Sequence, residues 1–191
     1  MPRKRLELDA RRAQLLSLGL SAFATKSYDA VSIDDLAQSA GVSKGLLYHY
    51  FPSKRELYVA TVREAAERLL AQIVPDPGLS PLEQVSRGVD AYLEYVGNNA
   101  DAYLSLMQSG VGRDREVHAI VERTRQRFVQ VMLDRAGPIQ LSPVQRVLLR
   151  GWVGMVEAAS LDWLKQPGVE RRELCSSLVG ALLHALQTTP H

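Results

Sequence analysis

Residues 31–57 read VSIDDLAQSAGVSKGLLYHYFPSKREL, and this stretch decides the fold. Ser32 is placed to cap the start of a short helix, and Asp35, three residues later, fits the pattern of a capping box. Gly41 is placed to end that helix, because glycine tolerates the left-handed backbone conformation found at helix ends. Ser43 then caps a second short helix. Two short helices joined by a tight turn that contains glycine predict a helix-turn-helix.

The start of the second helix has the composition of an element that enters the major groove of DNA. Its first residues, Ser43, Lys44 and Gly45, are small or polar, and glycine lets the backbone approach base edges closely. Tyr48 and His49 follow one turn later, and their side chains suit phosphate oxygens. Hairpins of this kind also occur in proteins that never touch DNA. A structural interpretation, with Tyr48 in the core and His49 at the surface, is therefore the alternative.

The next helix begins at Lys54, directly after Ser53, which is placed to cap it together with Glu56. A capped helix start offers free backbone N–H groups, and the lysine adds a positive charge, so the two together suit a phosphate. The alternative is a lysine that is merely solvated at the start of a helix.

Apolar residues recur with helical spacing along almost all of the remaining chain. They predict helices over about residues 8–25, 54–73, 81–98, 100–108, 114–135, 143–165 and 170–187. No long strand-like alternation and no internal repeat occurs, so the predicted fold class is all-α. The strongest break is Pro75–Gly78, and the long helix before it belongs to both halves. We therefore expect an N-terminal domain over 1–60 and a C-terminal domain over 61–191.

The composition fits one sizeable protein with a basic N-terminal part. The chain has 191 residues, of which 46% are hydrophobic and 23% charged. Residues 1–60 hold nine basic and six acidic side chains, whereas the remainder holds 14 basic and 15 acidic ones. This imbalance favours an anionic partner for the N-terminal part, and the near-neutral remainder argues against a non-specific architectural DNA protein, the main alternative. The single cysteine, Cys175, fits a reducing, cytoplasmic setting.

Other classes of protein lack their signatures in this sequence. The four histidines show no metal-ligand spacing, and there is no glycine-rich phosphate loop or Gly-x-Ser-x-Gly motif. We therefore expect no enzyme, no metal and no other cofactor. No apolar run approaches the roughly 18–20 residues of a membrane span. The basic and then apolar N-terminus could be a signal peptide, but Glu7 and Asp9 lie where such a peptide has no acidic residue.

Residues 31–57 closely resemble the DNA-binding domain of TetR-type transcriptional regulators, and the resemblance extends over about residues 10–60. The family pattern, Ala-Gly-Val-Ser-x-Gly-x-Leu-Tyr-x-x-Phe-x-x-Lys-x-x-Leu, matches without a gap over residues 40–57. Departures are small, since Ser32 stands where threonine is usual and Leu36 where isoleucine is common.

The resemblance implies an all-α homodimer with an N-terminal three-helix helix-turn-helix head and a C-terminal helical bundle for ligand binding and dimerisation. Each head would read half of a pseudo-palindromic operator in double-stranded DNA. A small-molecule effector in the body would release the DNA, so that the protein acts as a repressor. His49 precedes a tyrosine, whereas many members have the histidine second in that pair. The DNA contacts carried over by position are Ser32, Ser43, Lys44, Gly45, Tyr48, His49 and Lys54.

Large or adaptable side chains share helix faces in the C-terminal half, and such stripes are more often core than pocket wall. The resemblance places a pocket among these helices, and aromatic and methionine side chains suit a mainly apolar ligand. The expected ligand-binding residues are Tyr92, Tyr95, Tyr103, Met107, Phe128, Met132, Trp152 and Met155. Glu157, His118 and the Arg113–Arg115 loop are polar partners for the ligand or, alternatively, ordinary surface ion pairs.

The helix expected over 143–165 carries two apolar rows, so it must bury one in its own core and the other against something else. The last helix carries small residues that allow close approach. Together they predict half of a four-helix interface about a two-fold axis, and the resemblance assigns the same pair of helices to dimerisation. The expected interface residues are Val153, Val156, Leu164, Leu174, Leu178, Ala181, Leu182 and Ala185.

Overall fold

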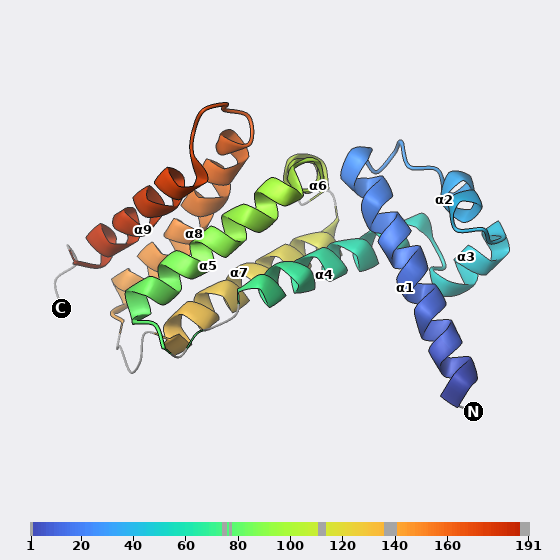
Figure 1. Ribbon diagram of the computed structural model, residues 1–191, viewed down its shortest axis with the longest axis horizontal. Helices are drawn as coiled ribbons and strands as arrows, with labels where there is room; N and C mark the ends of the chain where they lie inside the picture. Colours follow the sequence, from blue (N-terminus) through green and yellow to red (C-terminus); the bar gives the residue numbers. More distant parts are fainter. Residues whose placement is uncertain (1, 74–75, 77, 111–113, 136–140, 188–191) are drawn as a thin grey trace. The chain divides into compact units, whose positions relative to one another are not determined.

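The computed structural model describes residues 2–73, 76, 78–110, 114–135 and 141–187, and every regular element in these ranges is helical (Figure 1). The all-α prediction is therefore confirmed. The α-helices are α1 Pro2–Thr25, α2 Ile33–Ser39, α3 Lys44–Tyr50, α4 Lys54–Gln72, α5 Pro81–Asn98, α6 Ala100–Ser105, α7 Arg115–Arg135, α8 Pro143–Trp163 and α9 Arg171–Gln187. No helix of the described residues is long and apolar enough to cross a membrane.

The chain forms two compact units that interleave in sequence. Unit 1 is Met1–Glu67 with Asp101–Val121, and unit 2 is Arg68–Ala100 with Glu122–His191. Helices α4 and α7 each contribute residues to both units. The boundary expected at residue 60 separates a DNA-binding domain from an effector-binding domain. That functional boundary stays a prediction.

Unit 1 is built on a core in which α1 and α4 brace α2 and α3. Leu47 of α3 and Leu57 of α4 are each 1% exposed, and they share this core with buried residues of α1 and α2. Helix α1 approaches α4 closely at Gly19, where a Cβ atom would lie 2.9 Å from Thr61 Cγ2. Phe23 further along α1 packs edge-on against a tyrosine of α4 with ring centroids 4.9 Å apart. The short α2–α3 pair is thus held by longer helices on its inner side.

Three helices of unit 2 present the same apolar spacing inward. Helix α9 packs against both α5 and α8 (Figure 1). On each of the three, the buried residues fall at positions i, i+3, i+4 and i+7, which lie on one helix face. They are Val89, Tyr92, Leu93 and Val96 on α5; Leu149, Trp152, Val153 and Val156 on α8; and Cys175, Leu178, Val179 and Leu182 on α9.

The helix ends agree with the predicted ones with a few exceptions. Helix α1 begins at Pro2 rather than near Leu8, and the chain passes into a turn of π-helix over Leu106–Gly110 instead of continuing α6. The capping box expected at Ser32 forms in one direction only. Its hydroxyl accepts from the Asp35 N–H at 3.2 Å, whereas the aspartate side chain is a methylene shorter than the usual glutamate. Two of the four residues of the predicted break at Pro75–Gly78, Pro75 and Pro77, lie outside the described residues.

Candidate nucleic-acid interface

The turn between α2 and α3 is fixed by backbone geometry that only glycine adopts easily. Gly41 has φ +64°, in the left-handed region, and its N–H donates to the Gln38 carbonyl at 3.0 Å. The Val42 N–H donates back to the Ala37 carbonyl at 3.0 Å. These two bonds form a Schellman motif, which ends α2 and starts the turn at a defined angle. The orientation of α3 therefore follows from local hydrogen bonding.

Both predicted cap serines hold the starts of these two helices. The Ser32 hydroxyl accepts from the Asp35 N–H, and the Ser43 hydroxyl accepts from the Leu46 N–H, each at 3.2 Å. A hydroxyl that accepts a capping bond keeps its own proton to donate. Ser32 and Ser43 can therefore cap the helices and donate to a phosphate oxygen.

The outer face of α3 is open, and one residue anchors its inner face. Leu47 is buried in the unit 1 core, whereas Lys44, Gly45, Tyr48 and His49 are exposed. Tyr48 is 37% exposed, which favours the binding interpretation over the core interpretation. Of the residues that the sequence assigned to DNA, these four thus lie on one short helix that the core holds in place, whereas Ser32 and Lys54 lie at the starts of α2 and α4.

Lys44 does not stand alone on this face. Its ammonium lies 2.9 Å from Asp34 Oδ2 in the first turn of α2. The hydrogen bond and the charge of Asp34 raise the pKa of Lys44 above its usual value. Both side chains are exposed, so water also reaches the pair. The sequence analysis did not identify this pair, since the two residues belong to different helices.

Lys54 is half-buried at the start of α4 and already has two neighbours. Its ammonium donates to the Asp29 carbonyl at 3.2 Å and lies 4.8 Å from the centroid of the Tyr28 ring. An ammonium has three protons to donate, so these contacts orient the lysine without using all of them. The Ser53 hydroxyl accepts from the Glu56 N–H at 3.1 Å and caps the helix as expected.

Arg55, a second cation of α4, is held in an ion pair with a carboxylate of the same unit. The Arg55 guanidinium pairs with both carboxylate oxygens of Asp114, at 2.6 and 2.9 Å. Asp114 also accepts from the N–H groups of Glu116 and Val117 and so caps α7. The Arg55 hydrogen bond, together with these two, lowers the pKa of Asp114. Sequence reasoning missed this clamp, although an aspartate directly before a predicted helix is a recognisable cap signal.

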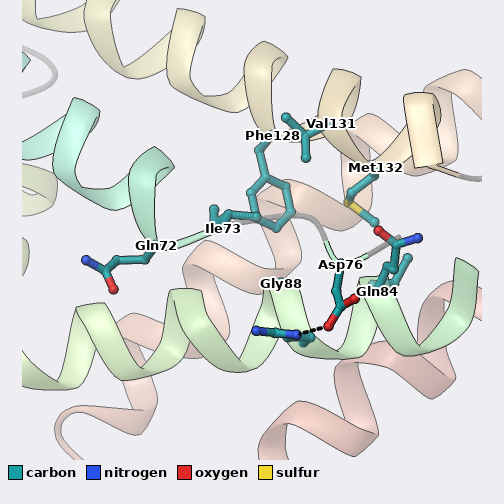
Figure 2. A pocket seen from close by; sticks show the side chains of 10 residues that line it. Gln72, Ile73, Asp76, Gln84, Gly88, Phe128, Val131 and Met132 are labelled. Atoms are coloured by element: carbon teal, nitrogen blue, oxygen red, sulfur yellow. Dashed lines mark hydrogen bonds and ion pairs between the residues drawn. The ribbon is translucent and has the colours of Figure 1, made fainter. Parts of the chain in front are cut away.

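The residues expected to bind an effector are dispersed in the structure. A cavity of about 30 Å³ lies in unit 2, and Figure 2 shows Phe128 and Met132 pointing toward it from α7. Tyr92 packs on Phe128 with ring centroids 6.1 Å apart. The Gln84 amide oxygen, which lines the same cavity, is buried and lacks a hydrogen-bond partner among the described residues.

Four other expected effector contacts do not line this cavity. The Trp152 indole N–H is buried and donates to the Leu178 carbonyl at 2.8 Å, so Trp152 is a core residue. Met155 is 40% exposed on the outside of α8. Tyr103 and Met107 are half-buried in unit 1.

Tyr95, on α5, is half-buried and is not among the residues that line the cavity. Of the polar partners considered, Glu157 pairs with Arg125, with atoms as close as 2.8 Å, and the two side chains are only 15% and 17% exposed, so the pair is not an ordinary surface ion pair. His118 is exposed, and Arg113 lies outside the described residues.

Half of the expected dimer residues are buried within the single chain, and the expected interface stays a prediction. Val153, Val156, Leu178 and Leu182 are each 5% exposed or less, because they form the inward faces of α8 and α9. The remaining four are half-buried or exposed: Leu164, Leu174, Ala181 and Ala185.

Helix α8 has an uncovered apolar face in the single chain, and it consists of other residues than those expected at the dimer interface. It carries exposed Val144, Val147, Leu148, Gly151 and Met155, which follow one another at helical spacing. Val147 is 71% exposed, which is unusual for a valine without a partner.

Comparisons with known proteins find matches to both the N-terminal and the C-terminal part of the chain. The family profile described as bacterial regulatory proteins of the tetR family matches residues 15–61. A second profile, described as the C-terminal domain of tetracyclin repressor-like proteins, matches residues 81–184. A crystal structure of a tetR-family transcriptional regulator from Streptomyces coelicolor is similar over 93% of this chain and 80% of that one, with a TM-score of 0.83 and 29% identity.

Named relatives include both activators and repressors. The HTH-type transcriptional activator FasR of Mycolicibacterium smegmatis is 26% identical over 68% of this chain and 60% of its own. The HTH-type transcriptional repressor KstR2 of the same species is 35% identical over 40% of this chain and 38% of its own. The chain thus spans less than two thirds of the length of these two relatives.

Proposed function

The chain belongs to the tetR family of bacterial regulatory proteins, and we propose that it binds a palindromic DNA operator as a homodimer, represses transcription there, and is released by a small, mainly apolar effector. As a member of this family it is a transcriptional regulator and not an enzyme. The observation that carries the proposal is the exposed N-terminal half of α3, held on a fixed hairpin. We expect the protein to act in the cytoplasm.

The DNA contacts divide into those that read bases and those that hold phosphates. Lys44 and Gly45 form the first turn of α3, which is the part of a recognition helix that reaches base edges. Ser32, Tyr48 and Lys54 place a hydroxyl or an ammonium around this turn, where phosphate oxygens accept. The half-sites would lie about 34–36 Å apart, one helical turn of DNA.

The homodimer is supported by the outer face of α8. An apolar row on an otherwise solvated helix is typical of an interface, and a two-fold axis would pair the row with itself. Glycine at position 151 lets two such helices approach closely.

The effector proposal rests on unit 2. Ligand pockets usually measure about 300–1,000 Å³. A cavity of about 30 Å³ holds no more than a water-sized group, so the effector must displace side chains as it enters. Met132 is suited to such repacking because its side chain is unbranched and flexible. The unpaired amide oxygen of Gln84 would favour an effector with one hydrogen-bond donor.

The deciding experiment is selection of random DNA fragments by the purified protein, followed by sequencing. Enrichment of a palindrome with half-sites one turn apart supports the proposal. Binding without enrichment favours the architectural alternative. No binding, repeated after unfolding and refolding to remove any co-purified ligand, overturns the regulator proposal.

Dimerisation is tested by the charge variant Val147→Glu. The matched control is Leu82→Glu, since Leu82 is also an exposed aliphatic residue of unit 2, 45% exposed, but lies on α5. Light scattering after gel filtration should give a monomer for the first variant only. Equal dimer content in both variants contradicts the α8 interface.

Effector binding is tested by filling the cavity with Met132→Trp. A graded panel of small apolar compounds is screened for release of wild-type protein from the selected operator. The variant should bind the operator normally and lose the response to the releasing compound. A response that survives in the variant places the effector elsewhere.

A further inference from the structure

The ammonium of Lys54 lies over an aromatic ring that the core of unit 1 holds in place. Lys54 Nζ is 4.8 Å from the centroid of the Tyr28 ring. That ring lies nearly parallel to Phe23 of α1, with centroids 6.1 Å apart, and edge-on to Tyr58 of α4, with centroids 5.2 Å apart. Phe23 is buried. Two helices therefore fix the position of a ring that belongs to the loop between α1 and α2.

The same loop supplies a second contact to this lysine. The Asp29 carbonyl, one residue after the ring, accepts from the ammonium at 3.2 Å. A hydrogen bond from the Ala30 N–H to the Ser27 carbonyl, at 3.0 Å, closes the loop into a turn around both residues. Lys54 is thus held on two sides by a short turn that lies far from it in the sequence.

We propose that Tyr28 is a positioning residue for DNA binding, whose ring holds the Lys54 ammonium in place for a phosphate oxygen before the DNA arrives. The proposal rests on the DNA-binding function proposed above. The ring acts through the lysine, and the contact with the phosphate is made by Lys54.

Both groups that hold Lys54 are electrically neutral, so they orient its positive charge without cancelling it. A ring attracts a cation through its quadrupole, and a carbonyl attracts it through its dipole. Lys44, by contrast, lies against the carboxylate of Asp34. An ammonium has three protons, of which the carbonyl takes one while the ring covers one side. A phosphate oxygen can therefore accept a remaining proton while both contacts persist.

The gain in affinity comes from side-chain ordering that is complete before binding. Fixing a free lysine side chain at an interface weakens binding by a factor of about 2–10. Lys54 is half-buried between two fixed neighbours, so it has already lost much of this freedom on folding. Because the ring contacts the ammonium with and without DNA, its attraction for the cation cancels from the binding equilibrium. Only the ordering of the lysine remains.

The test compares Tyr28→Leu, which removes the ring, with Tyr28→Phe, which keeps the ring and removes only the hydroxyl. Both are also made in a Lys54→Met background. Fluorescence anisotropy over a salt series gives the Kd for the selected operator and for a scrambled duplex of equal length. Melting curves check that each variant folds. In protein without DNA, NMR of isotope-labelled lysine reports the ring-current shift of the Lys54 methylene group next to the ammonium.

Tyr28→Leu should weaken binding to both duplexes by about 2–10-fold for each protomer that binds, since phosphates carry no sequence information. The salt slope should stay within about half a unit of the wild-type slope, because the lysine still reaches its phosphate. Tyr28→Phe should keep the wild-type affinity. In the Lys54→Met background, Tyr28→Leu should leave the affinity unchanged. The ring-current shift should be present in wild-type protein and in Tyr28→Phe, and absent in Tyr28→Leu.

Three results overturn the inference alone. Tighter binding by Tyr28→Leu shows that the ring competes with the phosphate for the lysine. A loss of affinity that persists without Lys54 shows a general effect on the fold of unit 1. An equal loss in Tyr28→Phe assigns the effect to the hydroxyl. Wild-type protein that binds neither duplex overturns the proposed function as well, so the two failures are distinguishable.

Discussion

Replacing Gly45 by alanine should raise the stability of the fold and lower the affinity for the operator. Gly45 lies in the first turn of α3, and an added Cβ would meet only Ser43 Oγ, at 3.9 Å, an ordinary contact. Alanine is favoured over glycine in helices by about 0.5–1 kcal/mol, and the lower value applies near a helix start. For a chain of this size, that gain raises the Tm by about 1–2 °C.

The effect on binding has the opposite sign. The methyl group points to the open side of α3, where the proposed function places base edges. A methyl group forced into a tightly packed contact costs about 1–3 kcal/mol, or a factor of roughly 5–150 in operator affinity. Scanning calorimetry gives the Tm, and fluorescence anisotropy with the selected operator gives the Kd.

The variant Gly41→Ala, in the preceding turn, is the comparison for Gly45→Ala. An added Cβ there meets nothing within 4 Å, but φ is +64°, so alanine pays the left-handed backbone cost of about 1–2 kcal/mol. This variant should lose stability, and its operator affinity should fall because α3 is displaced. Unchanged operator affinity in Gly45→Ala, or a lowered Tm, refutes the reasoning about a close backbone approach.

Three further changes test other parts of the structure. Gly19→Ala should destabilise the fold by about 1–3 kcal/mol in calorimetry, because its Cβ would lie 2.9 Å from Thr61 Cγ2. Lys54→Ala should weaken binding to all DNA sequences alike and flatten the salt slope by about one unit in titrations, whereas Lys54→Arg should largely keep both. Because the Arg55 hydrogen bond lowers the pKa of Asp114, this carboxylate stabilises the fold above about pH 4, the unfolded pKa. That contribution is lost as pH falls through the lowered pKa, so Asp114→Asn should flatten the stability curve in acid, measured by urea unfolding.

The helices could be predicted because their signals are local. Serines followed by proline mark the starts of α5 and α8, and capping boxes form at both, Ser80 with Glu83 and Ser142 with Gln145. The turn at Gly41 was predictable for the same reason, since the left-handed conformation is a property of one residue. Apolar spacing supplied the remaining boundaries to within a few residues.

The inward face of α8 could not be chosen from the sequence. The helix carries two apolar rows of similar character. Trp152 and Met155 were both expected to bind the ligand, yet Trp152 is buried and Met155 is 40% exposed. The choice is made by α9, whose Leu178 carbonyl accepts the Trp152 N–H. A contact across 26 residues of sequence leaves no trace in the periodicity of either helix.

The size of the cavity could not be predicted from the sequence either. A stripe of aromatic and methionine side chains is compatible with both a pocket and a packed core, and only the packing density decides between them. Phe128 and Met132 line open space, whereas Trp152 of the same predicted set fills the core. The apolar composition was predictable, but the vacant volume was not.

The ion pairs change how the charge of the N-terminal part is understood. Residues 1–60 carry a net charge of +3 by composition, which by itself would suit general attraction to DNA. Lys44 and Arg55 face carboxylates of the same unit, Asp34 and Asp114, but Asp34 is already counted in that sum, so only the Arg55–Asp114 pair lowers it, to +2. Positive charge that is compensated within the protein adds little to non-specific attraction and still allows directed hydrogen bonds.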